Sequence, residues 1–272
     1  MINTMGAGIT FHILGSSSQG NCALLETPHC RVLIDIGFPA KRLNELLEPT
    51  GRKLSDIDAV FITHEHSDHI SGLAGLARHP KVQVFANRET ARAAQIRLKF
   101  RPAWQFFETG STFKFRDVEV CTFAIPHDAT DPVGFVFSVT VGEAKPRRLA
   151  WCTDLGYVPE LVRERIRGAD VLVLESNYDP DMLDRDHKRP WALKQRIKSR
   201  HGHLSNYDAH ELLRTTENPA WRRVYLAHLS RECNDVQLVR DTFASFGQNG
   251  QRLEIEVIDP NGSILTCAMS EL

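Results

Sequence analysis

A run of six residues carries most of the chemistry that the sequence offers: His64-Glu65-His66-Ser67-Asp68-His69, of the pattern H-x-H-x-D-H. Neutral imidazole and carboxylate are the ligands that borderline divalent metals take in proteins. Side chains this rich in ligand atoms have no packing purpose, and buried polar groups must find partners. We therefore expect a metal site here rather than a polar loop that happens to be rich in histidine.

The stretches on either side predict how this run is placed. Residues 59–62 before it are apolar throughout, and residues 70–76 after it carry apolar side chains at helical spacing. The run therefore lies where a buried strand ends and a helix begins. Residues two apart point the same way on extended chain, so His64 and His66 can hold one ion. The last two residues of the run follow the turn and can hold a second ion.

Three more candidates, His127, Asp154 and His228, each come just after the C-terminal end of an expected strand. In α/β layers, sites gather outside such strand ends. Added to the run, they complete a set for two divalent ions. The expected ligands are His64, His66 and His127 for the first ion, Asp68, His69 and His228 for the second, and Asp154 as the bridge. These ligand types suit Zn²⁺, Mn²⁺ and Fe²⁺ alike, so the sequence does not select among the three metals.

The surrounding pattern predicts the elements that position these side chains. Strands are expected at 9–14, 22–26, 31–35, 59–62, 82–85, 112–115, 118–123, 133–141, 148–152, 171–174, 223–227 and 254–258. Helices are expected at 41–48, 71–79, 88–100, 159–167, 207–216 and 234–246. Strand-rich sections alternate with helices in two halves, about 1–140 and 141–272. This predicts an α/β protein of two sheets packed face to face with helices outside, in one domain over residues 1–272.

Composition narrows the class of protein. The net charge is −1, so a polyanion could be bound only by a local basic patch. The six cysteines form no C-x-x-C pair, which predicts reduced thiols. The sequence contains no apolar run of the roughly 18 residues that a membrane span needs, and its N-terminus lacks the pattern of a secretory signal. We therefore expect a cytoplasmic enzyme that does not associate with membranes.

The sequence resembles the metallo-β-lactamase fold superfamily. The resemblance rests on the H-x-H-x-D-H run, His127-Asp128, Thr153-Asp154 and His228-Leu229-Ser230, in the order of the family and over nearly the whole chain. It implies a four-layer αββα sandwich with two metal ions at one edge of the sheets. Asp154 at the bridging position implies the phosphodiesterase, thioesterase and lactonase side of the superfamily, because the β-lactamases themselves usually carry Cys there.

A finer resemblance is to the YycJ/WalJ-like branch, through Gly15–Asn21, Glu175–Asn177 and Gly202–Asn206. It implies a metal-dependent DNA exonuclease acting 5′ to 3′. Glu175 and His203 are also similar to the proton-donating pair of ribonuclease Z. The long substrate-clamping arm of that enzyme and the inserted domain of the β-CASP nucleases are both missing, which makes processing of tRNA precursors the weaker interpretation.

The expected reaction is phosphodiester hydrolysis by a hydroxide shared between the two metal ions, with attack in line at phosphorus. His203 would protonate the leaving oxygen, Glu175 would orient His203, and Asp68 is the third residue assigned a catalytic role. Asp35 ends its strand beside the run, where it either holds a liganding histidine or simply forms a turn.

Substrate contacts are expected from five residues and from one basic stretch. The residues are Ser16, Asn21, Asn177, Ser205 and Arg189. The stretch 185–200 carries seven Lys and Arg with Trp191 among them, and it is either a nucleic-acid contact or a solvated helix. The expected partner is nucleic acid, DNA rather than RNA. The alternatives are a hydrolase of small thioesters or lactones on the same metals, and a metal-stabilised binding module without turnover.

Overall fold

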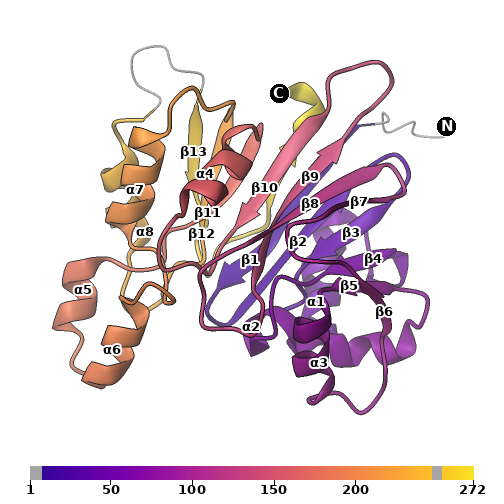
Figure 1. The fold of residues 1–272 in the computed structure, drawn as a ribbon, viewed down its shortest axis with the longest axis horizontal. Helices are drawn as coiled ribbons and strands as arrows, with labels where there is room; N and C mark the ends of the chain where they lie inside the picture. Colours follow the sequence, from indigo (N-terminus) through magenta and orange to yellow (C-terminus); the bar gives the residue numbers. More distant parts are fainter. Residues whose placement is uncertain (1–7, 247–252) are drawn as a thin grey trace.

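Two mixed β-sheets of seven strands each form the centre of the molecule (Figure 1). The computed structural model describes residues 8–246 and 253–272. The first sheet runs, in spatial order, through β14 (Leu265–Ala268), β1 (Thr10–Ser17), β2 (Gly20–Glu26), β3 (Arg31–Ile34), β4 (Ala59–Phe61), β5 (Gln83–Ala86) and β6 (Ala103–Phe106). The second runs through β13 (Glu254–Val257), β12 (Arg223–Ala227), β11 (Val171–Glu175), β10 (Arg147–Cys152), β9 (Val133–Val139), β8 (Val118–Ala124) and β7 (Thr112–Phe115).

Helices cover the outer face of each sheet, as Figure 1 shows. The first sheet is covered by α1 (Ala40–Leu47), the short α2 (Ser67–Ile70), a 3₁₀ segment (Ser71–Arg78) and α3 (Arg88–Gln95). The second is covered by α4 (Glu160–Arg167), α7 (Asn206–Thr215) and α8 (Val236–Phe243). Two further helices, α5 (Pro180–Arg185) and α6 (Trp191–Ile197), extend beside the sandwich. The predicted αββα architecture is confirmed.

The core between the sheets explains why several strands are apolar throughout. In β11, Val171 and Val173 face the inner core, whereas Leu172 and Leu174 pack under the helices. All four are fully buried, because a strand in the middle of four layers is covered on both faces. Such strands are stiff, fully paired supports. The side chains that follow their last residues are therefore held in fixed positions.

The prediction that the chain divides into its two halves near residue 140 is wrong. The chain crosses to the second sheet between Phe106 and Thr112, because β7 and β8 form an antiparallel hairpin that continues onto β9. The last strand, β14, then returns to the first sheet and pairs antiparallel with β1. The expected strands include neither β6 nor β14, each of which has four residues and lies at an end of the first sheet.

The segment expected as an α-helix at 71–79 is a 3₁₀ helix instead, and the α-helix begins earlier, at Ser67. Gly72 lies against the backbone, since a Cβ there would come within 2.4 Å of the carbonyl oxygen of Phe38. The segment therefore needs glycine at this position, and glycine weakens the α-helix. The helix expected at 88–100 also ends early, at Gln95.

Two further sequence predictions concern the chain as a whole. None of the helices in the described ranges has the length and apolar character that crossing a membrane requires. All six cysteines are free, and five of them are buried, which agrees with the expected reduced thiols.

Glu26, at the end of β2 remote from the metal-ligand run, gives a testable pH dependence. Burial raises its pKa, but hydrogen bonds with His12 (3.3 Å) and from Arg52 (2.7 Å) outweigh burial and lower the pKa to about 2. The stabilisation is therefore complete above the ordinary carboxyl pKa and is lost as the pH falls through about 2. We expect Glu26→Gln to lower the free energy of unfolding at pH 7 by about 1 kcal/mol after solvent screening.

The measurement for Glu26 is urea unfolding of the wild type and Glu26→Gln between pH 7 and pH 3. The difference between the two should shrink as the pH falls. Glu45→Gln is the matched control, because Glu45 is exposed and, within the described ranges, pairs only with Arg42. A difference that stays constant with pH would contradict the assignment.

Candidate metal centre

Strands of both sheets end at one edge of the sandwich, and the residues that follow them converge there (Figure 1). The predicted metal-binding and catalytic residues come from these strand ends. His64 and His66 follow β4, Asp68 and His69 lie in α2, His127 follows β8, Asp154 follows β10, Glu175 ends β11, and His228 follows β12. Because β8, β10, β11 and β12 run in the same direction, one edge of the second sheet collects four of these positions.

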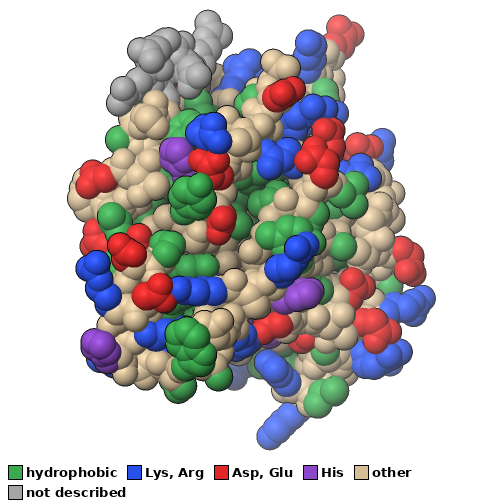
Figure 2. Space-filling view, turned by 60° about the vertical axis from the view of Figure 1, so that its left-hand side comes forward, with side chains coloured by type: hydrophobic (Ala, Val, Ile, Leu, Met, Phe, Trp, Pro, Cys, Tyr) green, Lys and Arg blue, Asp and Glu red, His purple; other side chains and the backbone are tan. Residues whose placement is uncertain are grey.

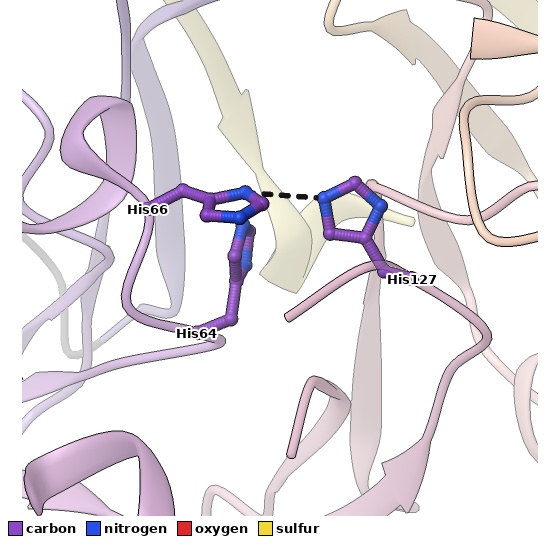
Figure 3. Close-up of side chains that lie close together, drawn as sticks. All are labelled: His64, His66 and His127. Carbon is purple, nitrogen blue, oxygen red and sulfur yellow. Dashed lines mark hydrogen bonds between the residues drawn. The ribbon is translucent and has the colours of Figure 1, made fainter. Parts of the chain in front are cut away.

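Three histidines form the first cluster, His64, His66 and His127, with potential ligand atoms within 4.8 Å of one another. Figure 3 shows the rings of His66 and His127 pointing at each other, with Nδ1 of His66 3.2 Å from Nε2 of His127. Two nitrogens on a tetrahedral zinc ion, each at about 2.0–2.1 Å, are separated by roughly 3.3 Å. The three rings therefore have the spacing of ligands to one ion.

Asp68, His69 and His228 form the second cluster, also within 4.8 Å. Asp154 lies between the two clusters. Its carboxylate oxygens are 3.3 Å from Nε2 of His69 and 3.9 Å from Nε2 of His127. The structure thus brings together the two groups expected from the sequence and places a carboxylate between them.

Each of four histidines is fixed from behind through Nδ1, which leaves Nε2 facing the cluster. The Nδ1 partners are Thr63 Oγ1 for His64 (3.0 Å), Asp35 Oδ2 for His69 (2.8 Å), the Gly202 carbonyl for His127 (3.0 Å) and Glu175 Oε1 for His228 (2.7 Å). Metal-binding histidines in proteins are commonly oriented in this way, since the outer hydrogen bond fixes both the ring and its tautomer.

Three buried atoms in the cluster have no hydrogen-bond partner among the described residues: His64 Nε2, Asp154 Oδ2 and His228 Nε2. Burying unpaired polar atoms costs free energy, so native proteins rarely do it without a reason. One of the three belongs to the first cluster, one to the second and one to the carboxylate between them. Two bound cations would satisfy all three, and the donor set therefore fits two divalent metal ions.

The electrostatics of the cluster favour cations. Burial lowers the pKa of His64 well below its ordinary value, and the neighbouring imidazoles act in the same direction, so this ring is neutral. At His69 burial is outweighed by the carboxylates of Asp154 and Asp35, which raise its pKa well above the ordinary value. At His228 burial is outweighed in the same way, with Asp154 the largest opposing influence, and the pKa rises to about 10. The buried carboxylates thus attract positive charge to this edge.

Three residues of the site have left-handed backbone: Asp35 (φ 56°), Asp154 (φ 63°) and His228 (φ 58°). Residues other than glycine seldom adopt this conformation, and it is concentrated at functional sites, where surrounding structure holds it in place. Asp35 and His228 come directly after a strand, and Asp154 comes two residues after the end of β10. The turn redirects each side chain toward the shared edge.

Asp35 is fully buried, and it accepts hydrogen bonds from His69 Nδ1 (2.8 Å) and from the backbone N–H of Thr63 (2.8 Å). Of the two interpretations of Asp35, the contact to a candidate ligand is the observed one. We expect Asp35→Asn to lower metal affinity by roughly 10–100-fold, because the ring of His69 loses its anionic partner. Calorimetric titration of each variant with the metal ion measures this affinity. Asp56→Asn, at the end of a short 3₁₀ helix (Leu54–Asp56), is the control, and equal affinities in both variants would contradict the assignment.

Glu175 connects the candidate ligands to His203. It accepts from His203 Nδ1 (2.8 Å) through the same oxygen that contacts His228, and its other oxygen accepts from the N–H groups of Leu155 and Leu204, both at 3.0 Å. Burial raises the pKa of Glu175, but these histidines outweigh burial and hold the pKa well below its usual range. Glu175 is therefore a buried anion that orients His203.

His203 is the accessible member of this group, with 23% of its side chain exposed. With Nδ1 bonded to Glu175, its Nε2 makes no hydrogen bond to any described residue. The ring borders a cleft of about 200 Å³ whose walls also include Asp128, Asn177, Arg189 and Arg196. A molecule in this cleft would lie against the side of His203.

The basic stretch 185–200 forms α6 and its flanks, and its charges are largely neutralised. Figure 2, which brings this side forward, shows basic and acidic side chains interspersed. The pairs are Arg185 with Asp181, Arg189 with Asp186 and Glu232, Arg196 with Asp128, and Lys198 with Asp184. Arg200 lies over the ring of Tyr157. Its surface therefore has much less positive character than the sequence indicates.

The five predicted substrate contacts fall into two groups. Asn177 and Arg189 line the cleft. Ser16, Asn21 and Ser205 are buried and bonded within the protein. Ser16 donates to Asn21 and accepts from the backbone N–H of His228, while Ser205 caps α7. Their position favours support of the site over contact with substrate.

Two residues of the site were missed in the sequence. Thr63 links Asp35 to the rings of His64 and His69 through its hydroxyl. Glu65, inside the run itself, accepts from both the N–H and the hydroxyl of Thr130 and so fastens the loop that carries His127. Their positions in the sequence could have identified them, since Thr63 precedes His64 and Glu65 lies between His64 and His66. Residues that hydrogen-bond to metal ligands and orient them can lie next to those ligands in the chain.

Comparisons with known proteins agree with this geometry. A family model described as a beta-lactamase superfamily domain matches residues 30–229. Exodeoxyribonuclease YycJ of Bacillus anthracis is 35% identical over 261 residues, which cover 93% of this chain and 96% of that protein. Exodeoxyribonuclease WalJ of Streptococcus pneumoniae serotype 2 is 36% identical over 242 residues, 88% of each. The solved structure of the metallo-beta-lactamase fold protein YhfI from Bacillus subtilis shares the fold, with a TM-score of 0.69 at 14% identity over 96% of this chain and 100% of that one.

Proposed function

The chain belongs to the beta-lactamase superfamily and is a metal-dependent hydrolase of its YycJ/WalJ-like branch, and on this premise we propose that it is a nuclease that shortens DNA from an end, 5′ to 3′. The observation that carries the proposal is the pair Glu175–His203, anchored beside two clusters of metal-ligand residues and facing a cleft. Two relatives that match nearly the whole chain are named exodeoxyribonucleases, which supports DNA as the substrate.

We assign His64, His66 and His127 to one divalent ion, Asp68, His69 and His228 to the other, and Asp154 to both. Zn²⁺ and Mn²⁺ both suit this donor set. When bound, such a pair of ions neutralises charge on the phosphate and lowers the pKa of a coordinated water.

The chain's own residues supply the proton for the leaving group. Nδ1 of His203 is bonded to Glu175, so its proton for transfer lies on Nε2, toward the cleft. Transfer from Nε2 to the departing oxygen of the phosphodiester avoids the release of an alkoxide, which is worth roughly 10²–10⁴ in rate. Asn177 and Arg189 line the same cleft and would position the nucleotide. Hydrolysis of a thioester or lactone has less need of this acid, which favours the phosphodiester.

The test is incubation of the purified chain, with Mn²⁺ or Zn²⁺, with single- and double-stranded DNA and RNA carrying a label at either end. We expect stepwise shortening of DNA, with a 5′ label released first as a mononucleotide or short product. Rapid thioester hydrolysis without cleavage of any nucleic acid would overturn the proposal. Release of a 3′ label first would overturn the direction alone.

A further inference from the structure

A second basic surface, on α3 and on the segment that joins it to β6, differs in character from the stretch at 185–200. Five Lys and Arg side chains are exposed there: Arg88, Arg92, Arg97, Lys99 and Arg101. Among the described residues only Arg92 has a carboxylate partner, Glu89 at 2.7 Å, on the same helix. This surface therefore keeps most of its positive charge, although the sequence pattern alone is that of an ordinary solvated helix.

A pocket of about 290 Å³ opens between α3 and β6 on this surface. Arg88, Arg92 and Arg101 line it together with the aromatic rings of Trp104 and Phe106. Phe106 is 43% exposed, and the guanidinium of Arg88 lies 4.9 Å from the centre of its ring. Guanidinium groups bind phosphate through paired N–H donors, and exposed aromatic faces stack on bases. The pocket thus combines the two kinds of contact that single-stranded nucleic acid offers.

The Trp104 ring is also held in place, because its Nε1–H donates to Gln95 of α3 at 3.0 Å. An aromatic side chain fixed in this way is already ordered before a base stacks on it, so less conformational entropy is lost on binding. An accidental surface aromatic has no comparable support. Residues of both α3 and β6 therefore form the walls of the pocket, and a hydrogen bond between α3 and β6 fixes one of these walls.

Both ends of α3 are tied to the loops that carry candidate metal ligands. Near its C-terminal end, Arg97 donates to the carbonyl of Glu65, which lies between His64 and His66. At its N-terminal end, Asn87 donates to the carbonyl of Asp131, in the loop after His127. A strand held in the cleft could therefore continue along α3 to the pocket.

We propose that the α3–β6 pocket binds a single-stranded part of the nucleic-acid substrate, away from the nucleotide that is cleaved. The proposal rests on the proposed nuclease function and deepens it. Arginines pair with backbone phosphates, while Phe106 and Trp104 stack on bases, so binding is strong but tolerant of sequence. Substrates long enough to reach both the cleft and the pocket bind more tightly than short ones.

The experiment compares Arg88→Glu/Arg101→Glu and Phe106→Ala with the wild type on two substrates. One is single-stranded DNA of about 30 nucleotides, and the other is thymidine 5′-p-nitrophenyl phosphate, which is too short to leave the cleft. On the long substrate we expect the double variant to raise KM about tenfold or more at an unchanged kcat, with a smaller rise for Phe106→Ala. On the short substrate, kcat and KM should stay as in the wild type.

Arg165→Glu/Arg222→Glu is the matched control, because both arginines are exposed, lie away from α3 and make no ion pair with described residues. An equal rise of KM in this control would show a general charge effect and overturn the proposal. A wild-type KM for the long substrate in the α3–β6 variants would also overturn the proposal. Binding of thymidine monophosphate that is lost in the double variant while KM for the long strand is kept would identify a free-nucleotide site instead.

The two proposals fail in different ways. If the wild type neither binds nor cleaves nucleic acid, the nuclease function and the pocket assignment are both wrong. If it cleaves DNA and the variants keep the wild-type KM, only the pocket assignment is wrong.

Discussion

Asp154→Asn is expected to hold fewer than two divalent ions per chain and to lose turnover by roughly a thousandfold or more, since metal-ion charge stabilisation is worth several kcal/mol. The carboxylate of Asp154 lies between the two clusters, with one oxygen buried and unpaired. Its charge is also the largest influence that favours positive charge on His69 and His228. The amide keeps the size of the side chain but removes that charge.

Metal content after dialysis, measured by mass spectrometry, and turnover on end-labelled DNA test this expectation together. Asp241→Asn is the control, because Asp241 is exposed on α8 and its side chain accepts a hydrogen bond from Gln237 on the same helix. Two tightly held ions in Asp154→Asn, with unchanged activity, would contradict the bridging assignment.

His203→Ala is expected to lower kcat on DNA by roughly 10²–10⁴ while metal content stays as in the wild type. The reason is that His203 lines the cleft and its Nδ1 is already bonded to Glu175, which leaves Nε2 for proton transfer. The loss should depend on the leaving group. Thymidine 5′-p-nitrophenyl phosphate releases an oxygen that needs no proton, so its hydrolysis should fall much less.

The comparison of the two substrates separates an acid from a merely structural residue. Equal losses on DNA and on the p-nitrophenyl ester, or a parallel loss of metal, would make His203 a ligand or a support instead. His201→Ala is a suitable control, because His201 is exposed and lies two residues away in the same loop.

The sequence predicted the site better than the division of the sheets. In the run at 64–69, extended backbone followed by a helix start was enough to separate His64 and His66 from Asp68 and His69, and the structure groups them in that way. The sequence identified three more candidates, His127, Asp154 and His228. Each follows a strand whose apolar residues make its C-terminal end easy to recognise. Their assignment as metal ligands stays a prediction.

What the sequence could not show depends on distant partners. The strand β14 is four residues long, and its partner β1 lies more than 240 positions away. The charge of α6 was overestimated because its acidic partners include Asp128 and Glu232, which are remote in sequence. The 3₁₀ segment after the run depends on the close approach of Gly72 to the loop at Phe38. The local sequence pattern carries no information on these contacts, because they join residues that are distant in the chain.

The return of β14 to the first sheet also bears on how the molecule forms during synthesis. β1 precedes every strand of the second sheet in the chain, yet one of its edges stays unpaired until β14 has been made, after all of those strands. An open strand edge is a template for wrong pairing, and contacts between distant segments form slowly. We infer that the two sheets and the metal-binding edge between them form together, late, as one folding unit. A nascent chain that stops before β14 leaves this edge of β1 without its partner strand.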